Sequence, residues 1–111
     1  MQPVKKNIKH TRGDTFQFDF QVNNAVAPLR KAYFTMTLKD QYVLQKKLND
    51  GITEVNTDVY RVRLEAEDTH DFPLKDYEYD MELTFGTDVV TPIEGTFTLT
   101  KDQTRGEWNG E

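Results

Sequence analysis

The sequence contains no cysteine and no serine, and it has only two histidines and one tryptophan among its 111 residues. Without cysteine there is no disulfide framework, no thiolate metal site and no cysteine nucleophile. Without serine the commonest hydroxyl nucleophile is missing too. A hydrolase would have to work through carboxylates or a metal ion, so we predict that the protein is not an enzyme and uses no cofactor.

Long hydrophobic runs are also absent. No stretch approaches the roughly 18 apolar residues of a membrane-spanning helix, and no apolar segment follows the lysines near the N-terminus. We therefore expect neither a membrane span nor a signal peptide. The chain is expected to be made in the cytoplasm and to stay there or to leave inside an assembly.

Acidic residues outnumber basic ones, with 19 Asp and Glu against 14 Lys and Arg, which gives a formal net charge of -5 and a pI of about 5.0. A protein with this net negative charge has too few basic side chains to neutralise the phosphates of a nucleic-acid backbone. Nucleic acid is therefore excluded as an expected partner.

The chain has the length of one domain. Residues 1–12 are polar and basic, and we predict a flexible arm or a weak edge strand there. Residues 13–101 form the predicted β-domain. Residues 102–111, which include Trp108, are predicted to be a flexible tail.

The clearest positive feature is the stretch Asp76–Phe85, in which apolar and polar residues alternate without a break. Because side chains along a strand point alternately to opposite faces, this pattern places one face on a core and the other in water. Half-buried strands of this kind are typical of antiparallel sheets. Six further strands are predicted over residues 15–22, 33–39, 43–48, 52–55, 59–66 and 89–99.

About seven short strands with turn residues between them predict an antiparallel, two-sheet, immunoglobulin-like sandwich, with a small barrel as the alternative. Asn49-Asp50-Gly51 is predicted to be a hairpin turn, and Pro28 to delay the second strand. Pro92 and Gly95 indicate an edge position or a bulge. Arg61 and Arg63 are expected to face the outer acids Glu78, Asp80 and Glu82 across a strand pair.

Two acidic groups resemble functional sites. Asp68, His70 and Asp71 could ligate a cation, yet a turn in which Asp68 caps one helical turn and Phe72 reaches the core fits better, so no metal site is predicted. The acids of the clearest strand could be mistaken for a catalytic pair. Without an apolar pocket we interpret them as a solvated face that also guards a sheet edge against aggregation. They are Asp76, Glu78, Asp80 and Glu82.

Two further features have both a functional and a structural interpretation. Arg12-Gly13-Asp14 spells a tripeptide that integrins bind, but it also makes an ordinary turn before a strand, with Gly13 at positive φ. Surface aromatic residues could stack on sugars, which suggests a carbohydrate-binding module as the alternative function, or they could fill a pocket of a neighbouring subunit. A second sheet or a bend could equally bury them. These aromatic residues are Tyr33, Tyr42, Tyr60 and Trp108.

Three stretches together resemble a known group of proteins: residues 12–18, which open the first strand, residues 68–80 at the corner, and residues 95–105 near the end. They are similar to small structural proteins of tailed bacteriophages and prophages, and most similar to the immunoglobulin-like or baseplate-upper-protein N-terminal type of domain. The resemblance implies a non-enzymatic virion or tail protein, made in the bacterial cytoplasm and assembled into the particle. It implies contacts with other phage structural proteins or self-association, and the lack of long apolar runs predicts no membrane partner.

The resemblance gives the two chain ends an expected role. The basic N-terminal arm, with Lys5, Lys6 and Lys9, or the C-terminal tail is expected to act as an assembly strap that orders on contact. No site residue follows from the resemblance, because its motifs are structural.

Overall fold

The computed structural model describes residues 4–22 and 28–101, and this part of the chain is all-β, as the alternation predicts. A single helical turn, α1 (Ala66–Thr69), interrupts the strands. The strands are β1 (Val4–Lys5), β2 (Ile8–Thr11), β3 (Phe16–Gln21), β4 (Leu29–Leu38), β5 (Gln41–Leu48), β6 (Gly51–Asn56), β7 (Val59–Leu64), β8 (Asp76–Phe85) and β9 (Asp88–Thr100).

β8 covers the clearest predicted strand from end to end. Tyr77, Tyr79 and Met81 are buried, whereas the acids between them are exposed, which confirms the predicted division into an apolar and a polar face. β8 lies between β4 and β9, and it is antiparallel to both. The expectation that its acids guard a sheet edge is therefore wrong, because β8 is an interior strand.

The strands follow one hydrogen-bonded path in the order β1-β9-β8-β4-β5-β6-β7-β3, with β2 also on β9. The sheet is mixed, whereas the sequence predicts an antiparallel one. β1 and β2 run parallel to β9, and β5 pairs with β6 in parallel over two residue pairs only. The parallel pairs at β9 arise because the N-terminal segment runs alongside the last strand in the same direction.

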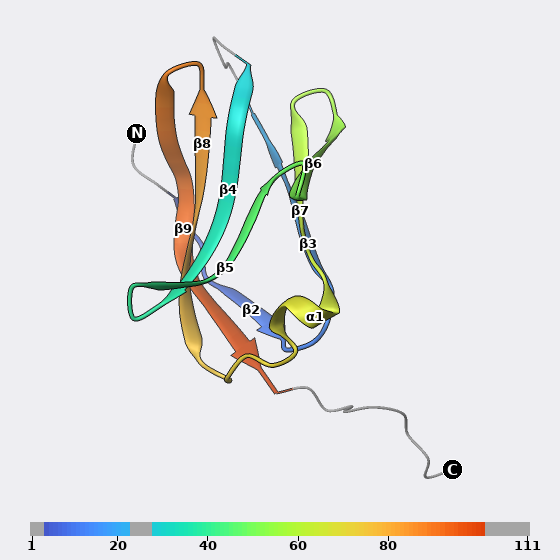
Figure 1. Ribbon diagram of the computed structural model, residues 1–111, viewed down its shortest axis with the longest axis vertical. Coiled ribbons are helices and arrows are strands. Elements are labelled where there is room, and N and C mark those ends of the chain that lie inside the picture. The colour runs from blue at the N-terminus through green and yellow to red at the C-terminus, as the bar shows by residue number, and fades with distance from the viewer. Residues whose placement is uncertain (1–3, 23–27, 102–111) are drawn as a thin grey trace, which may run out of the picture.

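The sheet curls until its two ends face each other, as Figure 1 shows: β3, β6 and β7 lie opposite β4, β8 and β9, and β5 crosses between the two groups. Aromatic rings meet inside the curl, with centroids 5.9 Å apart for Phe18 and Phe34 and 5.4 Å apart for Phe16 and Phe97. The core therefore lies between the two groups of strands. Its buried members are Ala32, Phe34, Met36, Ile52, Val62, Leu64, Tyr77, Tyr79, Met81, Leu83, Phe97 and Leu99.

The N-terminal segment, predicted as a flexible arm or a weak edge strand, forms β1 and β2 along β9. Gly95 makes this close approach possible, because a Cβ atom there would lie 2.2 Å from the carbonyl oxygen of Lys6. That oxygen also accepts a hydrogen bond from the Tyr79 hydroxyl at 2.6 Å. The sheet thus takes in residues before position 13. The predicted tail over residues 102–111 and the predicted turn at Asn23-Asn24 lie outside the described residues.

The connections differ from the predicted ones at two places. β4 begins at Leu29, directly after Pro28 and earlier than the predicted residue 33, with a bulge between Leu29 and Lys31. Its tight turn into β5 places Lys39 and Asp40 at positive φ, the conformation that a two-residue hairpin loop of type I′ requires. The turn after β5 does not form the predicted hairpin. There the chain rounds a corner from one group of strands to the other.

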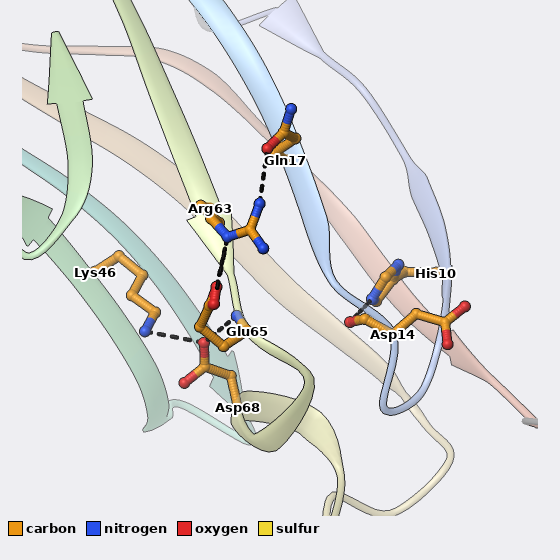
Figure 2. A network of polar contacts seen from close by, with 7 residues as sticks. All are labelled: His10, Asp14, Gln17, Lys46, Arg63, Glu65 and Asp68. Carbon is orange, nitrogen blue, oxygen red and sulfur yellow. Dashed lines mark hydrogen bonds and ion pairs between the residues drawn. The ribbon is translucent and has the colours of Figure 1, made fainter. Parts of the chain in front are cut away.

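The predicted contact between the arginines and the outer acids of β8 is wrong, because β7 pairs with β3 and β6 and not with β8. Arg61 instead donates to Asp19 on β3 at 2.8 Å. This hydrogen bond, together with the arginine charge, holds the pKa of the Asp19 carboxyl below its usual value. Arg63 contacts Gln17 and Glu65 (Figure 2).

Candidate functional site

The corner between β7 and β8 is a structural feature. Asp68 Oδ2 accepts a hydrogen bond from the Glu65 amide at 2.6 Å and lies 2.9 Å from Lys46 Nζ (Figure 2). The N-cap of α1 is Glu65 and not the predicted Asp68, which lies at the third position of the helical turn and completes a capping box with Glu65. Asp68 also ties the corner to β5. His70 and Asp71 are exposed. Within the described residues, no three His, Asp or Glu side chains come together in an arrangement able to hold a metal ion.

The Arg12-Gly13-Asp14 tripeptide is a turn fastened to the same corner. Gly13 has the expected positive φ of 83°, and its amide donates to Thr69 Oγ1 at 3.0 Å. Arg12 Nη1 donates to the Phe72 carbonyl at 3.2 Å. His10 Nε2 donates to the carbonyl oxygen of Asp14 at 3.0 Å (Figure 2). The bonds of Gly13 and Arg12 join the turn before β3 to α1 and to the loop after it, and the His10 bond closes the turn itself.

A groove of about 620 Å³ lies on the outer face of β9, β8, β4 and β5, opposite the core. Thr35, only 9% exposed, lies on β4 between β5 and β8, and the short side chains of Thr37 on β4 and Thr96 on β9 also line the groove. Longer side chains surround them, including Tyr33 and Tyr42. The hollow follows from this difference in side-chain length, which is set by the cross-strand register. We call this feature the outer groove.

The outer groove is strongly acidic. Glu94, Asp80 and Thr35 lie side by side on β9, β8 and β4, and Glu82 lies beside Tyr33. Glu78 is a fourth carboxylate in the lining, whereas Lys5, which lies 3.8 Å from Glu94, is the one basic side chain among the described residues that line it. Burial, followed by the charges of Glu82 and Glu94, raises the pKa of the Asp80 carboxyl.

The structure brings together only part of the predicted aromatic set. Tyr33 and Tyr42 both line the outer groove, and Tyr42 is 73% exposed. Tyr60 lies on β7, where its ring stacks on Phe20 with centroids 5.6 Å apart. Trp108 lies outside the described residues.

The acids that the sequence predicts as a solvated face divide between two surroundings. Glu78, Asp80 and Glu82 line the outer groove, whereas Asp76 accepts a hydrogen bond from Thr98 Oγ1 at 2.7 Å. Glu94 and Gln45 are groove residues that sequence reasoning missed. No local signal marks them, because only the strand register places them beside Asp80 and Thr35.

The fold and the outer groove define an all-β domain with a polar, acidic hollow on one sheet face. The groove offers carboxylate and amide acceptors, hydroxyl donors and the rings of Tyr33 and Tyr42, which are means of binding a ligand. No known family model matches this sequence, and no curated protein is significantly similar to it. Within residues 4–22 and 28–101, no helix has the length and apolar character needed to cross a membrane.

Proposed function

We propose that this protein is a non-enzymatic structural protein of a tailed bacteriophage or prophage particle. It is made in the bacterial cytoplasm, assembled into the virion or its tail baseplate, and acts through contacts with other structural proteins or with itself. The three sequence stretches that resemble such proteins are the starting point for this proposal.

The observation that carries the proposal is that these three stretches contact one another. The first and second meet where the Gly13 amide donates to Thr69 Oγ1. The first and third meet where the Phe16 ring packs edge-on against Phe97. Residues far apart in the sequence thus form one structural unit, which supports treating the three motifs as the signature of one fold.

We further propose that the fold is an immunoglobulin-like sandwich. The order β9-β8-β4-β5 corresponds to strands G-F-C-C′ of such a domain, and β6-β7-β3 to strands D-E-B. On this assignment, the two-residue pairing of β5 with β6 is the corner that links two sheets. Near the start of β8, the Tyr77 hydroxyl donates to the carbonyl of Pro73, four residues upstream, at 2.7 Å. This is the bond of a tyrosine corner, which marks strand F.

The test is to purify particles after induction of the source strain and to examine them by quantitative proteomics and immunogold labelling. We expect the protein at a stoichiometric level and at one defined ring or tail position. An abundant cytoplasmic protein of the host, measured in the same particles, gives the level of carry-over. A level no higher than that carry-over would refute the proposal.

A carbohydrate-binding module is the second candidate function. Tyr33 and Tyr42 favour it, because both rings border one groove whose polar lining suits hydroxyl groups. A broad glycan array, with the Tyr33→Ala and Tyr42→Ala variants as controls, tests this candidate. Binding that both substitutions remove would support it, and a silent array would reject it.

A further inference from the structure

We propose that the outer groove is a docking site for a basic segment of a partner protein. The inference rests on the proposed structural role and specifies the chemistry of the contact. In this arrangement an arginine or lysine side chain of the partner enters the groove among Asp80, Glu82 and Glu94, beside the tyrosines.

The shape of the groove is the first argument. Acidic residues on a flat face would simply be solvated, but these carboxylates line a hollow of about 620 Å³. Thr35 lies between Asp80 and Gln45 in the strand register, and its hydroxyl accepts a hydrogen bond from Gln45 Nε2 at 3.0 Å. A hydrogen bond between side chains of β4 and β5 therefore holds part of the groove lining in place. The outer side of the groove is open, so that a segment of another chain can lie across it.

Charge complementarity is the second argument. Among the lining residues that the structure describes, there are four carboxylates and one basic side chain, Lys5, which is 82% exposed. The carboxylates are those of Glu78, Asp80, Glu82 and Glu94. The four carboxylates and one ammonium leave the lining with a net charge of -3. A cation placed among them gains attraction and relieves the repulsion of Asp80 by Glu82 and Glu94.

The exposed aromatic rim is the third argument and is independent of the acids. Tyr42 is the most exposed of the large hydrophobic residues in the described part of the chain, at 73%, and Val43 beside it is also exposed. Tyrosine rings bind guanidinium and ammonium groups over their faces, and tyrosine is enriched where protein partners bind most tightly. Acids and tyrosines side by side therefore favour a basic protein segment over a neutral sugar.

The experiment is an NMR titration of the ¹⁵N-labelled full chain with a blocked tetra-arginine peptide. A blocked tetra-citrulline peptide, which has nearly the same shape but no charge, is the matched ligand control. We expect tetra-arginine to shift the amide signals of groove residues such as Thr35 and Thr96, and tetra-citrulline to leave them unchanged. Added salt should weaken the binding, because the groove is open to solvent.

Two double variants locate the binding site. Asp80→Asn with Glu82→Gln should weaken tetra-arginine binding by about tenfold or more. Glu54→Gln with Asp58→Asn removes the same charge from the β6–β7 hairpin and should leave the affinity within about twofold, with only the screened long-range effect remaining. The spectrum of each variant shows whether it is folded. Tyr42→Ala should also weaken binding, although it changes no charge.

Three results would overturn the inference. These are equal binding of tetra-citrulline, shifts spread evenly over the whole surface, and groove shifts produced by neutral chitotetraose but not by tetra-arginine, which would favour the carbohydrate alternative. The outcome is separable from the particle test. If the protein is found in particles but does not bind tetra-arginine in the groove, this inference alone is refuted. If the groove binds tetra-arginine but the protein is absent from particles, the proposed function is refuted and, with it, the partner assigned here.

Discussion

Asp80 shows at the scale of one residue how the sheet pattern produces a functional property. Strand alternation points its side chain away from the core, and the register then places Glu94 beside it on β9. Partial burial and the neighbouring charges of Glu82 and Glu94 all disfavour its ionised form. The groove thus contains a carboxylate that is less stable when charged in the folded protein than in the unfolded chain.

Asp80→Asn should therefore stabilise the protein at neutral pH. Because the pKa of Asp80 is raised on folding, the folded state binds more protons than the unfolded state between the two pKa values, so stability falls as pH rises through that window. Above this pH window the full free-energy cost of the ionised Asp80 carboxylate is present, and the uncharged amide of the variant removes that cost. Screening by solvent should keep the gain below about 1 kcal/mol.

Urea unfolding at pH 7 and at about pH 3, below the ordinary pKa of an aspartic acid, tests this expectation. The stability difference between the two proteins should shrink at the lower pH. Glu54→Gln, on the opposite group of strands, is the control for loss of one negative charge. A variant less stable than the parent protein at pH 7 would contradict the argument.

At the scale of elements, two tyrosine hydroxyls on β8 fasten different neighbours. Tyr77 donates to Pro73 in the corner after α1, whereas Tyr79 donates to Lys6 between β1 and β2. Both rings belong to the core. One strand therefore anchors both the corner and the N-terminal segment.

Tyr77→Phe should lower stability by about 1 kcal/mol, since it removes the partly buried hydrogen bond to the Pro73 carbonyl. The melting temperature should fall by about 4 °C. Tyr79→Phe serves as the matched variant. Hydrogen exchange should show the loss of protection near residues 72–75 for Tyr77→Phe and near residues 6–8 for Tyr79→Phe. The same pattern in both variants would refute separate anchoring roles.

Gly95→Ala should push the N-terminal segment away from β9. The new methyl group would meet the carbonyl oxygen and carbon of Lys6, which are backbone atoms and cannot rotate aside. We expect a cost of about 1–3 kcal/mol, the usual range for overpacking. The amide of Lys6, which donates to the Glu94 carbonyl at 2.9 Å, should exchange much faster with solvent. Thr96→Ala is the control on the same strand, and unchanged exchange in Gly95→Ala would contradict the close approach.

At the scale of the whole molecule, the strand order of the curled sheet has two ends. The N-terminal segment pairs with β9 and covers the end at that strand. β2 pairs with β9 from Ile8 to Thr11, and the buried ring of His10 packs against Phe16 and Phe97. The segment therefore both covers the backbone of β9 and closes the core between the two groups of strands.

Deletion of residues 1–11 should expose the edge of β9 together with apolar surface around Phe97. Uncovered strand edges pair readily with other chains, so the truncated protein should self-associate and lose stability. Light scattering after size-exclusion chromatography checks the mass, with the Lys5→Gln and Lys9→Gln variants as controls for loss of basic charge alone. A truncated chain with the same mass and stability as the full chain would refute the closing role.

Individual residues show how far sequence reasoning reached. The alternation of Tyr77, Tyr79 and Met81 predicted β8 to the residue, because the period of two is a local property of the strand. The partners of Arg61 were predicted wrongly. A strand pattern says which face a side chain occupies but not which strand lies beside it, and Asp19 on β3 carries the same charge as the acids of β8.

The all-β class, the strand faces and the turn at Gly13 could be predicted from the sequence, since each depends on residues within a few positions of one another. Tertiary structure alone decided the parallel docking of the N-terminal segment, the corner between β5 and β6, and the outer groove. The groove exists because register aligns Glu94, Asp80, Thr35 and Gln45 on four strands. Register is a long-range property, set when the two facing groups of strands bury their apolar side chains together.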